Sequence, residues 1–153
     1  NGMKCIVFGV LYYYLFSIIF YLYKGDFMSQ KTVLLDKALN FAARIVKLQK
    51  YLVSEKKETI ISNQIVRSGT SIGANINEAI YGQSKKDFIA KLSISLKETA
   101  ETEYWIKLLA LSDYLTAEEA DSLIFDCLEI KKILIASLKT AKSNNQDAAN
   151  AAK

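Results

Sequence analysis

Six polar residues near the middle of the chain have types and spacings that could support acid–base chemistry or bind an ion. They fall at helical intervals of three and four: Arg67, Ser71, Asn75 and Glu78, then Glu98 and Glu101. Side chains at such intervals share one face of a helix. Paired carboxylates can transfer protons or bind a divalent cation. The same groups can instead form a satisfied polar network that fixes the register of packed helices.

The rest of the sequence favours the structural interpretation of these residues. The chain contains no histidine, which removes His-based catalysis, His-ligated zinc and the Glu-x-x-His ligands of di-iron bundles. No nucleophile–base pair or phosphate-binding loop accompanies the carboxylates. We therefore predict a chain that is not an enzyme and holds neither a cofactor nor a metal. A carboxylate metal site at Glu98 and Glu101 is the alternative.

Four amphipathic helices are expected to position the polar residues. Apolar residues recur at intervals of three and four over residues 32–52 and 58–81, and in helices that begin at capping boxes at Ser84 and Thr116. Ser54 is the candidate N-cap of the second helix. The expected core positions are Leu35, Ala38, Ala42, Ile45, Leu48 or Gln49 and Leu52; Ile61, Ile65, Ser68, Ile72, Asn75 or Ile76 and Ala79; Phe88, Leu92, Ser95 or Leu96, Thr99, Thr102, Ile106 and Leu109; and Ala120, Ile124, Cys127, Ile130 or Lys131, Leu134, Leu138 and Ala141.

Short connections between these helices predict an all-α fold, an antiparallel up-down-up-down four-helix bundle over residues 28–142. The absence of Pro and the presence of only six Gly also favour long helices. In this arrangement Arg67 lies level with Glu98 and Glu101, so we expect it to pair with one of them, beside Trp105. Gly69 and Gly73 share one helix face and are expected to let a neighbouring backbone approach closely.

The same topology gathers lysines at one end of the bundle. The end formed by the turn between the second and third helices is expected to carry Lys31, Lys37, Lys85, Lys86, Lys139 and Lys142. The other end has a mixed or acidic charge. Together with a net charge of +4, this distribution predicts a surface that could hold a phosphate backbone with little sequence specificity. The alternative is an ordinary solvated surface.

The two ends of the chain differ from the bundle in composition. Residues 1–27 are a hydrophobic leader, whose uncharged segment 5–23 has the length of a membrane span. We interpret the leader as an upstream extension, with a membrane anchor as the alternative. Residues 143–153 are polar and are expected to form a disordered tail. Cys127 falls at an apolar helix position, which indicates a small buried hydrophobic residue.

The segment 64–105 resembles the bacterial four-helix-bundle family encoded within 23S rRNA intervening sequences. The resemblance runs from about Met28 to about Lys142, and its most specific part is the run from Arg67 to Glu78. The matching residues are Gln64, Arg67, Ser68, Gly69, Ser71, Ile72, Ala74, Asn75, Ile76, Glu78, Ala79, Ser84, Phe88, Glu98, Glu101, Tyr104 and Trp105. The family is similar in fold to the accessory variability protein of diversity-generating retroelements, which binds nucleic acid and a reverse transcriptase.

This resemblance implies a homo-oligomer, expected to be a pentamer, but attaches no active site to the matching residues. With the basic end, it leads us to expect a cytoplasmic protein that associates with RNA or with an RNA-associated protein. The alternative is a membrane-tethered interaction module, which requires residues 5–23 to be a real anchor.

Overall fold

A computed structural model describes the chain from residue 33 to residue 151, and residues from 34 onward form one compact unit. Every regular element in these residues is a helix, and short turns connect the helices. A first helix covers residues 33–54, and it is followed by α2 (Ile60–Ile80), α3 (Lys85–Leu111) and α4 (Ala117–Ala151). The protein is therefore all-α, as the spacing of its apolar residues predicts.

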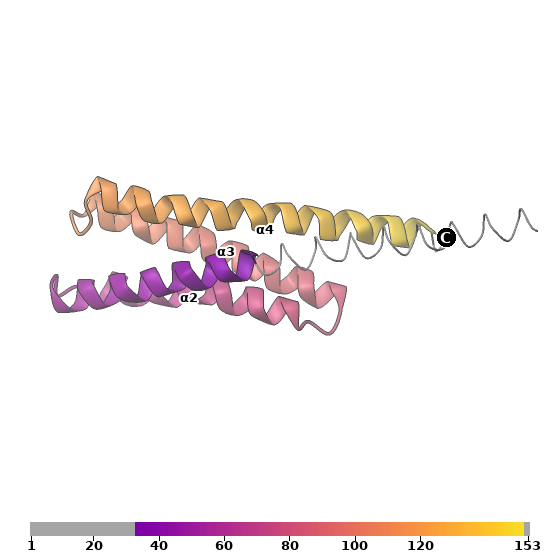
Figure 1. Ribbon diagram of the computed structural model, residues 1–153, viewed down its shortest axis with the longest axis horizontal. Coiled ribbons are helices and arrows are strands. Elements are labelled where there is room, and N and C mark those ends of the chain that lie inside the picture. Colours follow the sequence, from indigo (N-terminus) through magenta and orange to yellow (C-terminus); the bar gives the residue numbers. More distant parts are fainter. Residues whose placement is uncertain (1–32, 152–153) are drawn as a thin grey trace, which may run out of the picture. The chain divides into compact units, whose positions relative to one another are not determined.

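The four helices alternate in direction and form an antiparallel bundle (Figure 1). Helix 33–54 contacts α2 at Gly69 and contacts α4 through the ion pair between Lys37 and Glu129. The hydroxyl of Ser95 on α3 donates to the carbonyl of Ile72 on α2, and the thiol of Cys127 on α4 donates to the carbonyl of Thr99 on α3. Each helix thus packs on its neighbours in the expected up-down-up-down order.

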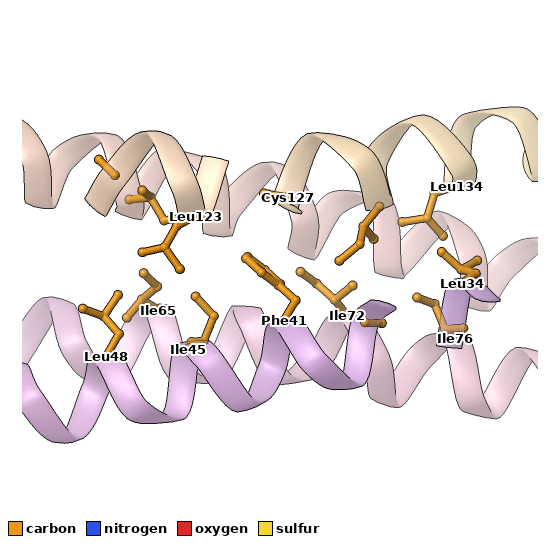
Figure 2. Close-up of a cluster of buried hydrophobic side chains, with 14 of the residues drawn as sticks. Leu34, Phe41, Ile45, Leu48, Ile65, Ile72, Ile76, Leu123, Cys127 and Leu134 are labelled. Carbon is orange, nitrogen blue, oxygen red and sulfur yellow. The ribbon is translucent and has the colours of Figure 1, made fainter. Parts of the chain in front are cut away.

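The core lies between the four helices and is built mainly from Ile and Leu. Figure 2 shows side chains of helix 33–54 and α2, such as Phe41 and Ile72, directed toward Leu123, Cys127 and Leu134 of α4. Cys127 is fully buried, and burial raises the pKa of its thiol to about 12. The prediction that Cys127 acts as a small core residue is confirmed.

Most predicted core positions on helix 33–54 and α4 are buried, but a few of them differ from the observed core. On helix 33–54 the buried residues include Leu34 and Phe41, whereas Leu35 and Ala42 are only partly buried. On α4 Leu123 is buried and Ile124 is partly buried. Runs such as Leu34-Leu35 and Leu123-Ile124 fit a helical interval equally well at either residue, so periodicity alone cannot choose between them.

The helix N-termini confirm two predicted caps and correct a third. Ser84 accepts a hydrogen bond from the Asp87 amide at 3.1 Å. Thr116 and Glu119 form a reciprocal capping box, in which the Thr116 amide donates to Glu119 and the Glu119 amide donates to the Thr116 hydroxyl. Ser54 does not cap α2, because it lies within the last turn of helix 33–54.

Glu58 takes the place of that predicted cap. Its carboxylate accepts hydrogen bonds from the amides of Ile60, Ile61 and Ser62 at 2.7–2.8 Å. A carboxylate near a helix N-terminus satisfies free amides and also interacts favourably with the helix dipole. Sequence patterns for caps favour Ser, Thr, Asp and Asn, so this Glu was missed.

The predicted segments at the two ends have different outcomes. The hydrophobic leader, including its apolar segment 5–23, lies outside the described residues. Among the helices that are described, none is both long and apolar enough to cross a membrane. At the other end α4 continues to Ala151, past the boundary expected at Lys142. That extension contains alanines and no Pro or Gly, a composition compatible with a helix.

Candidate functional site: the polar seam and the basic end

Arg67 connects α2 to two carboxylates of α3, as the antiparallel register predicts. Its guanidinium donates to Glu101, and its Nη1 lies 3.6 Å from Oε2 of Glu98. The indole Nε1 of Trp105 donates to the same Glu101 carboxylate at 3.1 Å. The Tyr104 ring packs edge-on against Trp105, with ring centroids 4.9 Å apart. We call Arg67, Glu98, Glu101 and Trp105 the Arg67 cluster.

The electrostatics of the Arg67 cluster are those of an ion-paired network. Partial burial raises the pKa of Glu101, but hydrogen bonds from Arg67 and Trp105 outweigh this effect and hold it below its usual value. The Glu98 carboxylate has one buried oxygen, Oε2, without a hydrogen-bond partner, and Arg67 is the nearby cation. The guanidinium therefore lies beside both carboxylates, where a bound cation would otherwise be needed to offset their charge.

We call the six polar residues at helical intervals, Arg67, Ser71, Asn75, Glu78, Glu98 and Glu101, the polar seam. Those outside the Arg67 cluster belong to separate contacts. Asn75 donates from its side-chain amide to the carbonyl of Ser71 at 2.9 Å, one turn earlier on α2. Glu78 pairs with Lys91 on α3. Lys91 was not among the predicted residues, although it lies near the same α2–α3 turn as Glu78 and its charge is complementary. The seam is thus a series of local pairs along the α2–α3 contact.

Beneath this seam the α2–α3 contact is lined by small hydroxyl residues. Ser68, Ser95, Thr99 and Thr102 are fully buried. The hydroxyls of Ser68 and Thr102 lie 2.9 Å apart across the two helices, and Thr99 donates to the carbonyl of Ser95 within α3. Small side chains let the two helices approach closely while each hydroxyl keeps a partner.

The two helical glycines face helix 33–54 but differ in the space around them. A Cβ atom at Gly69 would lie 2.9 Å from Cγ2 of Ile45, which is closer than such atoms normally come. At Gly73 the nearest atom would be Cβ of Ala38 at 3.6 Å, an ordinary van der Waals contact. Close packing therefore requires glycine at position 69, and position 73 has room for a methyl group.

The basic end contains only some of the predicted lysines. Lys85, Lys86, Lys139 and Lys142 are exposed, on the first turn of α3 and on the C-terminal half of α4. Figure 1 shows the α2–α3 turn and this part of α4 at the same end of the bundle. Among residues 33–143, whose side chains the structure describes, no carboxylate forms an ion pair with any of these four lysines.

The other two predicted lysines do not join this set. Lys31 lies outside the described residues. Lys37 donates to Glu129 of α4 at 2.8 Å, and this hydrogen bond raises the pKa of Lys37. Glu129 lies in the N-terminal half of α4, away from Lys139 and Lys142. Lys37 is therefore ion-paired, unlike the four exposed lysines named above.

Two further ion networks, which the sequence argument missed, hold α4 in place. Arg44 bonds to Asp126 and to the Ser122 hydroxyl, joining helix 33–54 to α4. Glu103 accepts hydrogen bonds from Lys107 at 2.6 Å and from Lys131 at 2.8 Å, joining α3 to α4. Those bonds lower the pKa of Glu103. The complementary charges on adjacent helices could have been used to predict these networks from the sequence.

The metal alternative at Glu98 and Glu101 lacks a wider set of ligands. In the part of the chain that the structure describes, no three His, Cys, Asp or Glu side chains lie close enough together to hold a metal ion. The two carboxylates have Arg67 as their cationic neighbour. The Arg67 cluster can therefore fix the α2–α3 register without an added ion.

Comparison with known proteins identifies a family and similar solved structures. The sequence profile of the family described as 23S rRNA-intervening sequence protein matches residues 30–136. A crystal structure of a protein with unknown function from the S23 ribosomal protein family of Bacteroides thetaiotaomicron VPI-5482 is 55% identical in sequence, with a TM-score of 0.71. The similarity covers 72% of this chain and 98% of that one. Curated proteins gave no match. The chain belongs to the 23S rRNA-intervening sequence protein family.

Proposed function

We propose that this chain is a non-enzymatic, homo-oligomeric bundle that binds RNA through its basic end. The observation that carries the proposal is the group of exposed lysines at that end: Lys85, Lys86, Lys139 and Lys142. They have no carboxylate partner among residues 33–143, whose side chains the structure describes, so their charge is available to a phosphate backbone. Contacts of this kind release counterions from the nucleic acid and carry little sequence information.

The charge at the opposite end of the bundle supports this choice of surface. There Lys56 and Lys57 lie in the helix 33–54 to α2 connection, beside Glu55 and Glu58 in the sequence. The α3–α4 connection at that end contributes Asp113, and the first turn of α4 contributes Glu118 and Glu119. Negative charge of this kind would repel a phosphate backbone.

The assembly and the lack of catalysis rest on separate arguments. Copies of the chain that bring their basic ends together would multiply the positive potential, and we propose a pentamer as the assembly. The absence of catalysis is supported by the Arg67 cluster, whose carboxylates have a structural partner in Arg67. The descriptions of the family and of the similar crystal structure refer to rRNA and ribosomal proteins, which supports RNA as the polyanion.

A salt series of RNA binding tests the proposal directly. The affinity of the purified protein for an unstructured RNA should fall steeply with salt. K85E/K86E should weaken binding about tenfold or more and should make the slope of log K against log salt shallower by about two. The matched control K56E/K57E makes the same charge change at the opposite end and should have a smaller effect. Equal losses from both pairs, or no binding at low salt, would contradict the proposed surface.

A further inference from the structure

A line of exposed residues runs along α4 on the side opposite its core contacts. The positions alternate at intervals of three and four, and every one is exposed: Glu118, Asp121, Phe125, Leu128, Lys132, Ile135, Lys139 and Lys142. We call these residues the outer stripe. Its three apolar members, Phe125, Leu128 and Ile135, are 63%, 45% and 50% exposed. Large apolar side chains grouped on one exposed face mark an interaction surface more often than scattered ones do.

The spacing of the outer stripe is that of a coiled-coil seam. Alternating steps of three and four place residues at positions a and d of a heptad, and a helix with such a seam packs lengthwise against another helix. The inner face of α4, with Leu123, Cys127, Ile130 and Leu134, already packs within the bundle. The outer stripe is a second seam with no helix against it in the described part of the chain.

Charge varies along the outer stripe in one direction. It begins with Glu118 and Asp121, continues through the apolar residues, and ends with Lys139 and Lys142. Among residues 33–143, none of these four charged side chains, nor Lys132, forms an ion pair. A stripe that is acidic at one end and basic at the other is complementary to itself when reversed.

An antiparallel copy of α4 fits this pattern at every position. If the two-fold axis passes beside residue 130, each a position faces a d position of the other copy. Glu118 then faces Lys142 and Asp121 faces Lys139. Phe125 faces Ile135, and Leu128 faces the aliphatic stem of Lys132, whose charged end can still reach water. The two-fold axis repeats each of these pairs once.

We infer that the outer stripe of α4 joins two copies of this chain in antiparallel orientation. The charge gradient identifies the occupant as a second copy. An anionic membrane or nucleic acid along the whole stripe would be repelled by Glu118 and Asp121. A partner of unrelated sequence would have to reproduce the same order of charges and apolar residues.

This contact goes beyond the proposed RNA-binding function and does not depend on it. It is isologous, meaning that the same surface is used by both copies, so it differs from the head-to-tail contact that a five-membered ring requires. The pairing would engage Lys139 and Lys142 and leave Lys85 and Lys86 of the basic end for RNA. Mass measurements made without RNA therefore test the pairing separately from RNA binding.

Charge reversal at the two ends of the stripe gives a decisive experiment. E118K/D121K makes both ends basic, and K139E/K142E makes both ends acidic. Each variant alone should self-associate about tenfold more weakly than the wild-type chain, because like charges would face each other. An equimolar mixture of the two variants should associate at least as tightly as the wild-type chain, because every end pair is then acidic with basic.

Sedimentation equilibrium of the full chain without RNA provides the readout. The wild-type mass should be an even multiple of 17.2 kDa, which is ten chains if the proposed pentamers pair, and each variant alone should have half that mass. The exposed pair K47E/K50E on helix 33–54 changes the same charge away from the stripe and should behave as wild type. A monomeric wild-type chain, variants that keep the wild-type mass, or a mixture that fails to recover it would overturn the inference.

Discussion

The α2–α3 contact and the outer stripe of α4 reverse the usual distribution of polar and apolar residues. In the α2–α3 contact, Ser68 and Thr102 are fully buried. On the outer stripe, Phe125 and Ile135 are at least half exposed. Buried hydroxyls are common only where each has a hydrogen-bond partner, and grouped exposed apolar side chains are common only where another surface covers them.

This contrast indicates that the polar residues of the α2–α3 contact stabilise the fold, whereas exposed residues are the candidates for binding a partner. The polar residues that first suggested chemistry are used within the fold, by the Arg67 cluster and by the hydroxyls beneath it. The candidate binding residues are Phe, Leu, Ile and Lys side chains. They suggest a binding surface only because the folded chain leaves them exposed. Substitutions in the buried α2–α3 contact and at exposed charged residues test this difference.

The largest effect is expected from filling the close approach at position 69. Gly69→Leu should destabilise the bundle by about 3 kcal/mol, because even its Cβ would meet the buried Ile45 side chain at 2.9 Å. Gly73→Ala is the matched control. It should be neutral or stabilising by up to about 1 kcal/mol, since the site has room and alanine favours the helix. Thermal and urea unfolding measure both, and equal losses at the two positions would show that the packing argument is wrong.

A smaller effect is expected from the buried hydroxyl pair. Thr102→Val should cost about 1–2 kcal/mol, because the Ser68 hydroxyl would lose a partner inside the α2–α3 contact. The double variant S68A/T102V should cost less than the sum of the single variants, with a coupling of at least about 0.5 kcal/mol. Thr140→Val, at an exposed hydroxyl of α4, serves as the control. If the cost of the double variant equals the sum of the single costs, the two hydroxyls do not stabilise each other.

The smallest effect on the free energy of unfolding is expected at the partly exposed Glu101, and it depends on pH. The pKa of Glu101 is lowered in the folded chain, so its ion pair stabilises the fold above its ordinary pKa of about 4.3 and the stabilisation is lost as pH falls through the lowered value. Glu101→Gln should therefore flatten the acid side of the stability curve. Urea unfolding between about pH 2 and pH 6 measures this slope. A variant curve parallel to the wild-type curve would contradict the assignment.

Much of the fold could be predicted from the sequence, because it depends on local periodicity and capping. The spacing of Ile65, Ser68 and Ile72 placed α2, and Thr116 with Glu119 marked the start of α4. Adjacent apolar pairs such as Leu34-Leu35 left the rotation of a helix undecided. That choice is made by the packing of all four helices together.

The candidate site was less predictable, because its contacts depend on register between distant helices. The pairing of Arg67 with Glu98 and Glu101 followed from counting outward from one short turn. The pairing of Lys37 with Glu129 could not be counted in this way, since three connections separate these residues along the chain. The outer stripe of α4 could be recognised only after exposure showed which apolar residues the bundle leaves uncovered.

Cysteine cross-linking across the outer stripe tests the central claim most directly. With Cys5 and Cys127 replaced by Ala, D121C/K139C should oxidise to a covalent dimer, since antiparallel pairing brings position 121 beside position 139 of the other copy. The two positions lie about 27 Å apart within one α4 helix, which is too far for an intrachain disulfide. D121C alone should remain uncross-linked. A dimer from D121C alone, or none from D121C/K139C, would contradict the antiparallel contact.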